Sequence, residues 1–293
     1  MAEAQQGPLR TYRGNCHCGA FVYEVELPEI KSAAECNCSI CLKKGYLHLF
    51  PLWEHFKIVK GDESTLAAYT FGPGAMIHKF CPTCATPVMV NRPGLAAGQR
   101  FSLNARAIQG LNKWELERQQ SDGKARGNPY QAPEYNGSKP SAEIENAKLY
   151  SGSCHCGAVT LALKSVPLDK EYPGRVVDCN CSVCERNAYV WIYPKADQVT
   201  IQGEENIGRY QFGNYILDKT FCKTCGVAIS NLGAELTDEQ ISGLREGLRE
   251  WHARAEFIFP VNLRVLNNFN LKDIKEPQKA TRGAEILPQY VNP

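Results

Sequence analysis

The sequence lacks a strong excess of charge, a long hydrophobic run and the pattern of a secretory leader. Its 33 Lys and Arg residues nearly balance 31 Asp and Glu residues, and no basic block stands out, so composition gives no support for nucleic-acid binding. No run approaches the roughly 20 apolar residues of a membrane span, so we expect no membrane partner. The first ten residues contain no apolar signal-peptide core. We therefore expect a cytoplasmic protein, with the nucleus as the alternative, where thiols stay reduced.

What the sequence does have is cysteine, 14 residues in a chain of 293. Each half reads C-x-C, then C-x-C-x-x-C, then C-x-x-C, and no cysteine falls outside this pattern. The first set is Cys16, Cys18, Cys36, Cys38, Cys41, Cys81 and Cys84, and the second is Cys154, Cys156, Cys179, Cys181, Cys184, Cys222 and Cys225. An odd number per half argues against closed disulfide sets. Clustered thiols in a reducing compartment indicate metal binding or catalysis.

The repeat extends beyond cysteine. R-G-N-C-H-C-G-A at Arg13–Ala20 matches S-G-S-C-H-C-G-A at Ser151–Ala158. Such self-similarity indicates one fold unit duplicated in tandem. Length alone also favours about two domains. We therefore predict a first domain over 9–135, a linker rich in turn-forming residues over 136–147, and a second domain over 148–293.

Short strands broken by Gly, Pro and Asp turns predict a mainly β fold, two tandem zinc-binding domains of short antiparallel sheets. Phe21–Leu27 alternates like a half-buried strand, and Phe56–Lys60 and Val199–Gln202 are further candidates. The second repeat alone contains an insertion, Thr237–Trp251, which opens on a capping-box pattern. Apolar residues at spacings of three and four predict one helix with a single apolar face there.

Seven cysteines per repeat divide into four and three. The C-x-x-C pair needs a second pair, for which the early C-x-C is the natural donor, and this completes a closed zinc site. The C-x-C-x-x-C triad then remains for a second ion with an open position, so we predict up to two Zn²⁺ per domain. In the alternative, all sites are closed by a further ligand. His17 and His155 are candidates for that ligand or plain turn residues, and Glu35 and Asp178 either supply an oxygen or face solvent.

The motifs G-x-C-H-C-G, C-x-C-S-x-C and F-C-x-x-C together resemble the glutathione-dependent formaldehyde-activating enzyme family, also named for centromere protein V. The resemblance covers nearly the whole chain, as two copies, and implies small zinc-holding β-tent domains. It implies that the structural zinc ligands are Cys16, Cys18, Cys81 and Cys84 in one copy and Cys154, Cys156, Cys222 and Cys225 in the other. It implies that the catalytic zinc ligands are Cys36, Cys38 and Cys41, and Cys179, Cys181 and Cys184. The family activity it implies is condensation of formaldehyde with glutathione, a carbon–sulfur lyase reaction.

The ligand chemistry is consistent with that activity. Three thiolates on Zn²⁺ leave a net negative complex, which is a poor activator of water but suits a soft incoming thiol. Coordination lowers the pKa of that thiol and yields a thiolate that can attack a carbonyl carbon. A glutathione substrate also requires cations for its carboxylates. Each candidate for this role could instead be a surface charge or a hydrogen-bond donor at a sheet end. The candidates are Arg106, Arg264, Lys43 and Lys44 after the first triad, and Arg186, which follows Glu185 after the second triad.

We therefore predict a zinc-dependent carbon–sulfur lyase-type enzyme whose partner is a small thiol, glutathione or its carbon adduct. One alternative is a non-catalytic zinc-stapled scaffold, and another is a metal-free redox enzyme that uses the triad cysteines as nucleophiles. The family pattern has Gly after the C-x-x-C pair. Gly226 keeps this pattern in the second copy, whereas Ala85 departs from it in the first. This departure predicts a reshaped or strained turn in the first copy. The oligomeric state, a homo-oligomer included, stays open.

Overall fold

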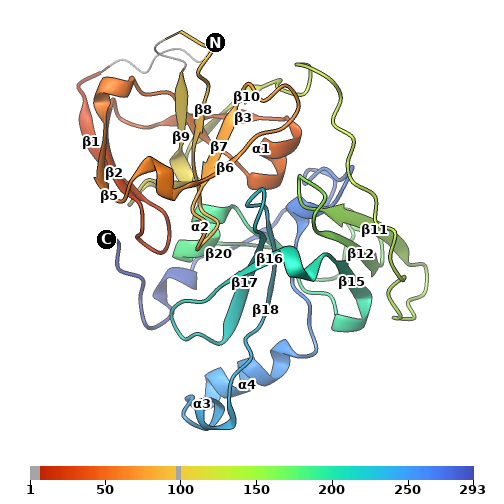
Figure 1. Cartoon of the computed structure of the whole chain (residues 1–293). Helices are drawn as coiled ribbons and strands as arrows, with labels where there is room; N and C mark the ends of the chain where they lie inside the picture. Colours follow the sequence, from red (N-terminus) through yellow and green to blue (C-terminus); the bar gives the residue numbers. More distant parts are fainter. Residues whose placement is uncertain (1–6, 97–99) are drawn as a thin grey trace. The chain divides into compact units, whose positions relative to one another are not determined.

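The computed structural model describes residues 7–96 and 100–293 and divides into two compact units. Unit 1 consists of Met1–Gln131 with Ser182–Ala188 and Val291–Pro293, and unit 2 consists of Ala132–Cys181 with Tyr189–Tyr290. Figure 1 shows each unit as a set of short strands in the colours of the sequence. The domain boundaries expected from the sequence remain predictions. Among the described residues, no helix combines the length and apolarity needed to cross a membrane.

The strands of unit 1 form two sheets. Their bounds are β1 Arg10–Asn15, β2 Val22–Leu27, β3 Ser32–Cys36, β4 His48–Leu49, β5 Phe56–Lys60, β6 Ala67–Tyr69, β7 Ile77–Phe80, β8 Pro87–Asn91, β9 Phe101–Asn104 and β10 Glu117–Ser121. The smaller sheet has the order β1-β2-β5, and the larger has the order β10-β3-β4-β9-β8-β7-β6. Aromatic rings fill the space behind the smaller sheet, where Tyr23 and Phe56 have centroids 5.4 Å apart.

Unit 2 repeats this plan. Its strands are β11 Lys148–Ser153, β12 Thr160–Ser165, β13 Val177–Cys179, β14 Val190–Ile192, β15 Val199–Gln202, β16 Ile207–Tyr210, β17 Leu217–Cys222, β18 Ala228–Gly233, β19 Val261–Asn262 and β20 Gln278–Ala280. The orders are β11-β12-β15 and β16-β17-β18-β19-β14-β13-β20, the same as in unit 1 once the strands are matched by position. The prediction of a mainly β fold in two repeated halves is confirmed.

Pairing departs from the antiparallel expectation at one edge of each large sheet. β10 lies parallel to β3, and β20 lies parallel to β13. The physical reason is that β10 and β20 come from the end of each repeat, and a long connection permits a parallel return that a tight turn does not. This return brings the end of each repeat back to the strand that carries the first cysteine of the triad.

A buried asparagine in each repeat ties the large sheet together. Asn104 Oδ1 accepts from the Leu47 backbone N–H at 3.2 Å, and its amide nitrogen donates to Pro87 O at 2.9 Å. Asn262 makes the equivalent contacts with Val190 and Ala228. Because both asparagines are fully buried, these bonds satisfy an amide that would otherwise be costly to bury.

Helices are short and only partly as expected. α1, Ser39–Lys44, and α2, Ser182–Asn187, each begin inside a cysteine triad, where the sequence analysis expected only a turn. The insertion begins as predicted, because Thr237 caps α3, Asp238–Ser242, through a capping box. The single helix is wrong, however. The chain turns after Gly243, and a second helix begins, α4, Glu246–Ala255. Trp251, which belongs to the predicted apolar face, is exposed.

Short 3₁₀ helices complete the connections. They lie at Trp53–His55, Glu63–Thr65, Ala105–Ala107, Ala196–Gln198, Glu204–Asn206, Leu263–Val265 and Gly283–Glu285. Two of these 3₁₀ helices contain Arg106 and Arg264. The buried asparagines Asn104 and Asn262 cap them, because each asparagine side chain accepts a hydrogen bond from the backbone N–H of the arginine. Each asparagine thus serves the sheet and the turn after it.

Candidate metal centres

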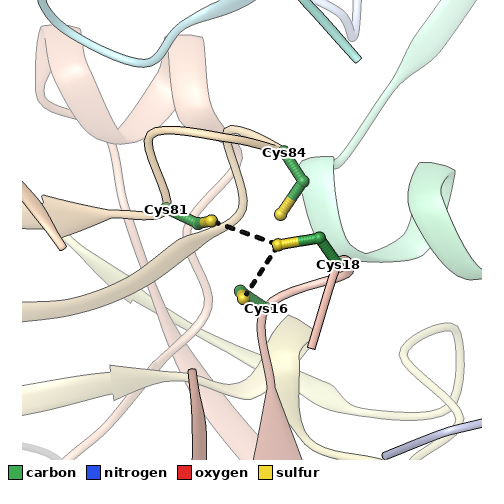
Figure 2. Close-up of side chains that lie close together, drawn as sticks. All are labelled: Cys16, Cys18, Cys81 and Cys84. Atoms are coloured by element: carbon green, nitrogen blue, oxygen red, sulfur yellow. Dashed lines mark hydrogen bonds between the residues drawn. The ribbon is translucent and has the colours of Figure 1, made fainter. Parts of the chain in front are cut away.

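The first four-cysteine cluster joins two distant segments of unit 1. Figure 2 shows Cys16 and Cys18 facing Cys81 and Cys84 across the cluster, with all four sulfurs within 4.8 Å of one another. The Sγ–Sγ distances are 3.6 Å for Cys16–Cys18 and 3.5 Å for Cys18–Cys81. Sulfurs bound to one zinc ion at about 2.3 Å lie about 3.8 Å apart, whereas disulfide sulfurs lie about 2 Å apart. The spacing fits a zinc ion and excludes a disulfide.

The second repeat builds the same cluster from Cys154, Cys156, Cys222 and Cys225. Its Sγ–Sγ distances, 3.5 Å for Cys154–Cys156 and 3.6 Å for Cys156–Cys222, repeat those of the first cluster. In both clusters three of the four cysteines are buried. This is the closed, solvent-poor arrangement of a structural zinc site.

The turn after each C-x-x-C pair is the same despite the change from Gly to Ala. Gly226 has φ 66°, and its N–H donates to Cys222 O at 2.8 Å. Ala85 has φ 59°, and its N–H donates to Cys81 O at 2.9 Å. Because L residues other than Gly are disfavoured at such φ values, the first copy keeps the turn at an energetic cost and does not reshape it.

The cluster thiols perturb one another. Hydrogen bonds from Cys16 and Cys18 lower the pKa of Cys81, whereas burial raises the pKa of Cys84. One thiolate is therefore stabilised by neighbours that keep their protons. Four thiolates at this spacing require a cation to balance their charge, which is what a zinc ion supplies.

The first triad is built where β3 ends and α1 begins. Cys36 is the last residue of β3, Cys38 is the N-cap of α1, and Cys41 lies within the helix. Their three sulfurs lie within 4.8 Å of one another, and no histidine or carboxylate atom of the described residues lies within that distance of all three. Cys36 and Cys38 are partly exposed, and Cys41 is buried. The triad therefore offers three ligands and faces solvent on one side.

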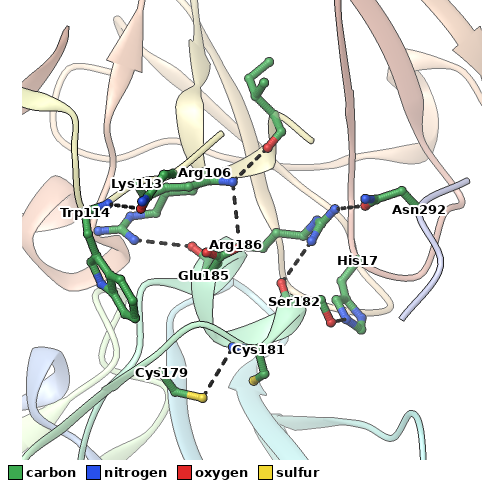
Figure 3. Close-up of polar contacts among 12 residues, drawn as sticks. His17, Arg106, Lys113, Trp114, Cys179, Cys181, Ser182, Glu185, Arg186 and Asn292 are labelled. Atoms are coloured by element: carbon green, nitrogen blue, oxygen red, sulfur yellow. Dashed lines mark hydrogen bonds and ion pairs between the residues drawn. The ribbon is translucent and has the colours of Figure 1, made fainter. Parts of the chain in front are cut away.

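The second triad has the same build and the same exposure. Cys179 ends β13, Cys181 follows in the turn, and Cys184 lies in α2. The backbone N–H of Cys181 donates to Cys179 Sγ at 3.4 Å, as Figure 3 shows, and the corresponding distance for Cys38 and Cys36 is 3.5 Å. The sequence analysis grouped all 14 cysteines as these four clusters, and the structure brings the same residues together.

Each triad is closed on one side by the loop that follows the parallel edge strand. In the first repeat, Asn37 donates to Asp122 Oδ1 at 2.8 Å and accepts from the Lys124 N–H at 2.8 Å. A Cβ atom on Gly123 would lie 2.4 Å from Cys36 Sγ. This contact explains the glycine, because any side chain there would displace a triad sulfur.

The second repeat uses the same device. Asn180 donates to Thr281 O at 2.7 Å and accepts from the Ala284 N–H at 3.0 Å. A Cβ atom on Gly283 would lie 2.4 Å from Cys179 Sγ. The residue between the first two cysteines of each triad is therefore asparagine because it binds the loop that covers the triad.

A hydrogen-bonded path leads from the first triad into the sheet. His48 Nε2 lies 3.3 Å from Cys41 Sγ, and His48 Nδ1 lies 2.9 Å from Ser102 Oγ. Arg92 Nη2 donates to Ser102 Oγ at 3.1 Å. Burial, together with the Arg92 charge, lowers the pKa of His48 to about 3, so its ring is neutral. Arg92 can only donate, so the Ser102 hydroxyl accepts from it, and the neutral His48 ring connects this hydroxyl to the Cys41 sulfur through its two nitrogens.

The second repeat has no counterpart to this path. The strand registers pair His48 with Asn104 and Trp191 with Asn262, so these positions are equivalent. Residues that cannot continue the path stand at the three matching positions, which are Trp191, Pro260 and Gly233. Lys219 packs instead against the Trp191 ring, with Nζ 5.1 Å from its centroid.

The proposed fourth ligands take other roles. His17 Nε2 forms a hydrogen bond with Ser182 Oγ at 2.8 Å (Figure 3). Glu35 accepts from Gln120 Nε2 at 2.9 Å. Neither these residues nor His155 and Asp178 belong to a ligand group among the described residues. The turn-residue and solvent interpretations suit them better than ligation.

The expected carboxylate-binding arginines are occupied elsewhere. Arg106 Nε donates to Gly45 O at 2.7 Å, and its Nη1 donates to Glu185 O at 3.3 Å (Figure 3). Arg186 is buried and donates to Asn15 Oδ1 at 3.0 Å and Asn292 Oδ1 at 2.7 Å. These are the hydrogen-bond roles that the sequence analysis gave as the alternative.

The lysines after the first triad are also not surface charges. Lys43 and Lys44 are both buried, and Lys44 Nζ lies 4.2 Å from the centroid of the Phe80 ring. The Arg264 backbone N–H donates to Asn262 Oδ1 at 3.4 Å. The solvated-surface interpretation is therefore wrong for the two lysines.

Comparison with known proteins agrees with this geometry. The family model described as glutathione-dependent formaldehyde-activating enzyme matches residues 11–115 and 149–257, together more than half of the chain. The chain belongs to this family, in two tandem copies. It is also similar to the crystal structure of a Rhodobacter sphaeroides structural-genomics protein, at 24% identity and a TM-score of 0.33, over 44% of this chain and 99% of that one.

Sequence reasoning missed the residues that distinguish the two family domains. The sequence analysis singled out none of His48, Arg92 and Ser102. One signal could have indicated His48: it lies seven residues beyond the last triad cysteine, and the equivalent residue of the second copy is Trp191. Arg92 carried no such signal, because only the pairing of β8 with β9 brings it beside Ser102.

Proposed function

We propose that this protein is a zinc-dependent carbon–sulfur lyase-type enzyme that joins a thiol such as glutathione to a carbonyl carbon and reverses that step. The observation that carries the proposal is the contrast between its clusters. The four-cysteine groups are closed and buried, whereas each triad offers three sulfurs, two of them partly exposed. An open position beside three protein ligands is the arrangement of catalytic zinc sites.

The residues suit zinc by their chemistry. All ligand atoms in the four groups are cysteine sulfurs, the soft donors that select Zn²⁺ over Mg²⁺ or Ca²⁺. Cys16, Cys18, Cys81 and Cys84, with their second-repeat equivalents, would hold structural zinc. The two triads would hold the reactive zinc, and up to two ions per domain result. When bound there, zinc supplies an attachment point for an incoming thiol and lowers its pKa.

The chemical step balances without a further reactant. The thiol sulfur donates an electron pair to the carbonyl carbon and forms the C–S bond. The π pair of the C=O bond moves to oxygen, which takes up the proton that the thiol released. In the reverse direction the C–S bond breaks, and the same atoms return as thiol and aldehyde. The reaction consumes free thiol, which fits the reducing cytoplasm as its compartment.

The chain's own residues prepare the triad for this step. Asn37 and the Gly123 loop hold the first two sulfurs in place, and the neutral His48 ring places Nε2 3.3 Å from Cys41 Sγ. A hydrogen bond to a ligand sulfur fixes its orientation, as outer-shell partners do in metal sites generally. The solvent-facing sides of Cys36 and Cys38 leave room for the substrate thiol.

The test is exchange between ¹³C-formaldehyde, glutathione and their adduct, followed by NMR on the zinc-loaded full chain. We expect faster exchange than in buffer, and loss of that acceleration in a chain carrying Cys36→Ser and Cys179→Ser. Glu35→Gln is the matched control, because Glu35 lies beside the triad but outside the ligand group. Its exchange rate should equal that of the unsubstituted chain.

Zinc content distinguishes the outcomes. The doubly substituted chain should keep its four-cysteine zinc and its circular dichroism spectrum while it loses about two zinc ions per chain. Acceleration that survives in this chain would show that the triads are not the reacting centres. A chain that unfolds on triad substitution would favour the scaffold alternative.

A further inference from the structure

Arg92 is connected to the first triad through hydrogen bonds and keeps donors that could bind a further ligand. Its guanidinium is half-buried, donates from Nη2 to Ser102, and has Cζ 5.1 Å from the centroid of the Phe50 ring. No carboxylate pairs with Arg92 among the described residues, and its Nε and Nη1 donors make no hydrogen bond there. An arginine withdrawn from water without a counter-ion is unusual, because desolvation of its charge is then uncompensated.

The first triad and Arg92 are joined by charge and by hydrogen bonds. Burial lowers the pKa of Arg92, and the charges of Cys41 and Cys36 act in the opposite direction. Three contacts of 3.1, 2.9 and 3.3 Å connect the guanidinium to Cys41 through Ser102 and His48. The guanidinium therefore lies near enough to the triad for its charge to act on a ligand that the triad holds.

The guanidinium of Arg92 is partly exposed to solvent, and so is the ring against which it lies. Phe50, which carries the guanidinium on its ring face, is 39% exposed. An arginine stacked on an aromatic ring loses less conformational freedom when it binds, and its free Nε and Nη1 edge matches a carboxylate. The second repeat has Gly233 at this position, so no side chain offers such a fork there.

We propose that Arg92 binds a carboxylate of the thiol that the first triad accepts, and that the second triad, which lacks this arginine, does not select for a carboxylate. The proposal rests on the proposed function, since it requires a thiol at the triad. It assigns Arg92 as a specificity-determining residue and gives the two repeats different substrate ranges. The first takes carboxylate-bearing thiols, and the second takes thiols irrespective of charge.

The test uses the full chain loaded with Co²⁺, whose visible bands report a change of ligands at a three-cysteine site. Cys179→Ser with Cys181→Ser leaves only the first triad to respond, and Cys36→Ser with Cys38→Ser leaves only the second. The probes are 3-mercaptopropionate and its methyl ester, which differ in one carboxylate charge. Arg92→Gln and Arg92→Lys are made in both backgrounds, with Lys124→Gln as the control cation near the triad.

With only the first triad responsive, Arg92→Gln should weaken binding of the acid about tenfold or more and leave the ester within about twofold. Arg92→Lys should recover part of the loss, and Lys124→Gln should change neither probe. With only the second triad responsive, acid and ester should bind alike, and Arg92→Gln should have no effect. Retained Co²⁺ bands in the absence of thiol show that each variant is still folded at its metal site.

Two results would overturn the assignment of Arg92. An equal loss for acid and ester would mean that Arg92 acts on the triad and not on the ligand. An equal preference for the acid at the second triad would mean that the selectivity arises elsewhere. A chain whose bands respond to neither thiol would overturn the proposed function, and this proposal with it.

Discussion

Seven residues beyond the last cysteine of its triad, the first repeat has His48 and the second has Trp191. The triads themselves are alike: each has three converging sulfurs, a buried third cysteine, an asparagine-bound loop and a glycine against the first sulfur. Their surroundings are not alike. The first is linked to a serine and an arginine, and the second has tryptophan, proline and glycine at the same positions.

The comparison teaches that ligand geometry and ligand environment are separable. Backbone pairing and the glycine loop determine the positions of the sulfurs, and both repeats retain them. Charge and hydrogen bonding around the sulfurs depend on single side chains of neighbouring strands, which have diverged. The two copies thus share the cysteine geometry of a metal site, and the first has a polar connection that the second lacks.

The largest difference between the two repeats should be a difference in exchange rate when one triad at a time is inactivated by a Cys→Ser substitution. We expect the glutathione-dependent exchange rate of Cys36→Ser to be lower than that of Cys179→Ser by about tenfold or more, because Gly233 replaces Arg92 beside the second triad. NMR exchange rates at limiting glutathione measure this, with zinc content as the control for equal metal loss. Equal rates in the two variants would remove the functional distinction between the repeats.

Removal of the hydroxyl in the middle of the path should cost stability. Ser102→Ala removes the partner of the Arg92 Nη2 donor and of the buried His48 Nδ1 atom, which we expect to lower the free energy of unfolding by about 2–3 kcal/mol. Urea unfolding of the zinc-loaded chain measures it. Ser230→Ala is the matched control, since its hydroxyl pairs with Thr220 Oγ1 in the second repeat. A loss no larger than that of the control would show that the path is not a stabilising unit.

Lys113 should make the free energy of unfolding depend on pH, whereas its equivalent in the second repeat, Leu271, should not. Burial lowers the pKa of Lys113 from 10.5 to about 8, against the opposing effect of Glu185. The unfolded chain therefore binds more protons above pH 8, and stability rises with pH there. From pH 8 to 10 the unsubstituted chain should gain about 2 kcal/mol relative to Lys113→Met. Parallel curves for the two chains, with Leu271→Met as control, would contradict a buried charged lysine.

The smallest effect should come from the turn where the copies differ by a single methyl group. Ala85→Gly should raise the free energy of unfolding by about 1 kcal/mol, because glycine relieves the left-handed backbone. The reciprocal change, Gly226→Ala, should lower it by a similar amount. Thermal unfolding of both variants measures the pair. Destabilisation by Ala85→Gly would show that the methyl group packs usefully enough to outweigh its strain.

Much of the architecture was predictable from the chain, because the relevant signals are local. Alternation and turn residues predicted strands such as β5 and β15, and the capping box predicted the start of α3. The end of the helix was not predictable from its apolar spacing. Apolar periodicity continues through Gly243, whereas the backbone does not, so the pattern overran the break.

The sequence by itself determined the repeat, the cysteine groups and the family, since ligand number and spacing are written along the chain and soft thiols leave few alternatives for the metal. Only the tertiary structure decided what stands beside each triad. His48 lies on β4, Ser102 lies on β9 and Arg92 directly follows β8, and the pairing of these strands makes the three residues neighbours. Because contacts across a sheet depend on register and not on sequence distance, that difference between the repeats became visible only in the fold.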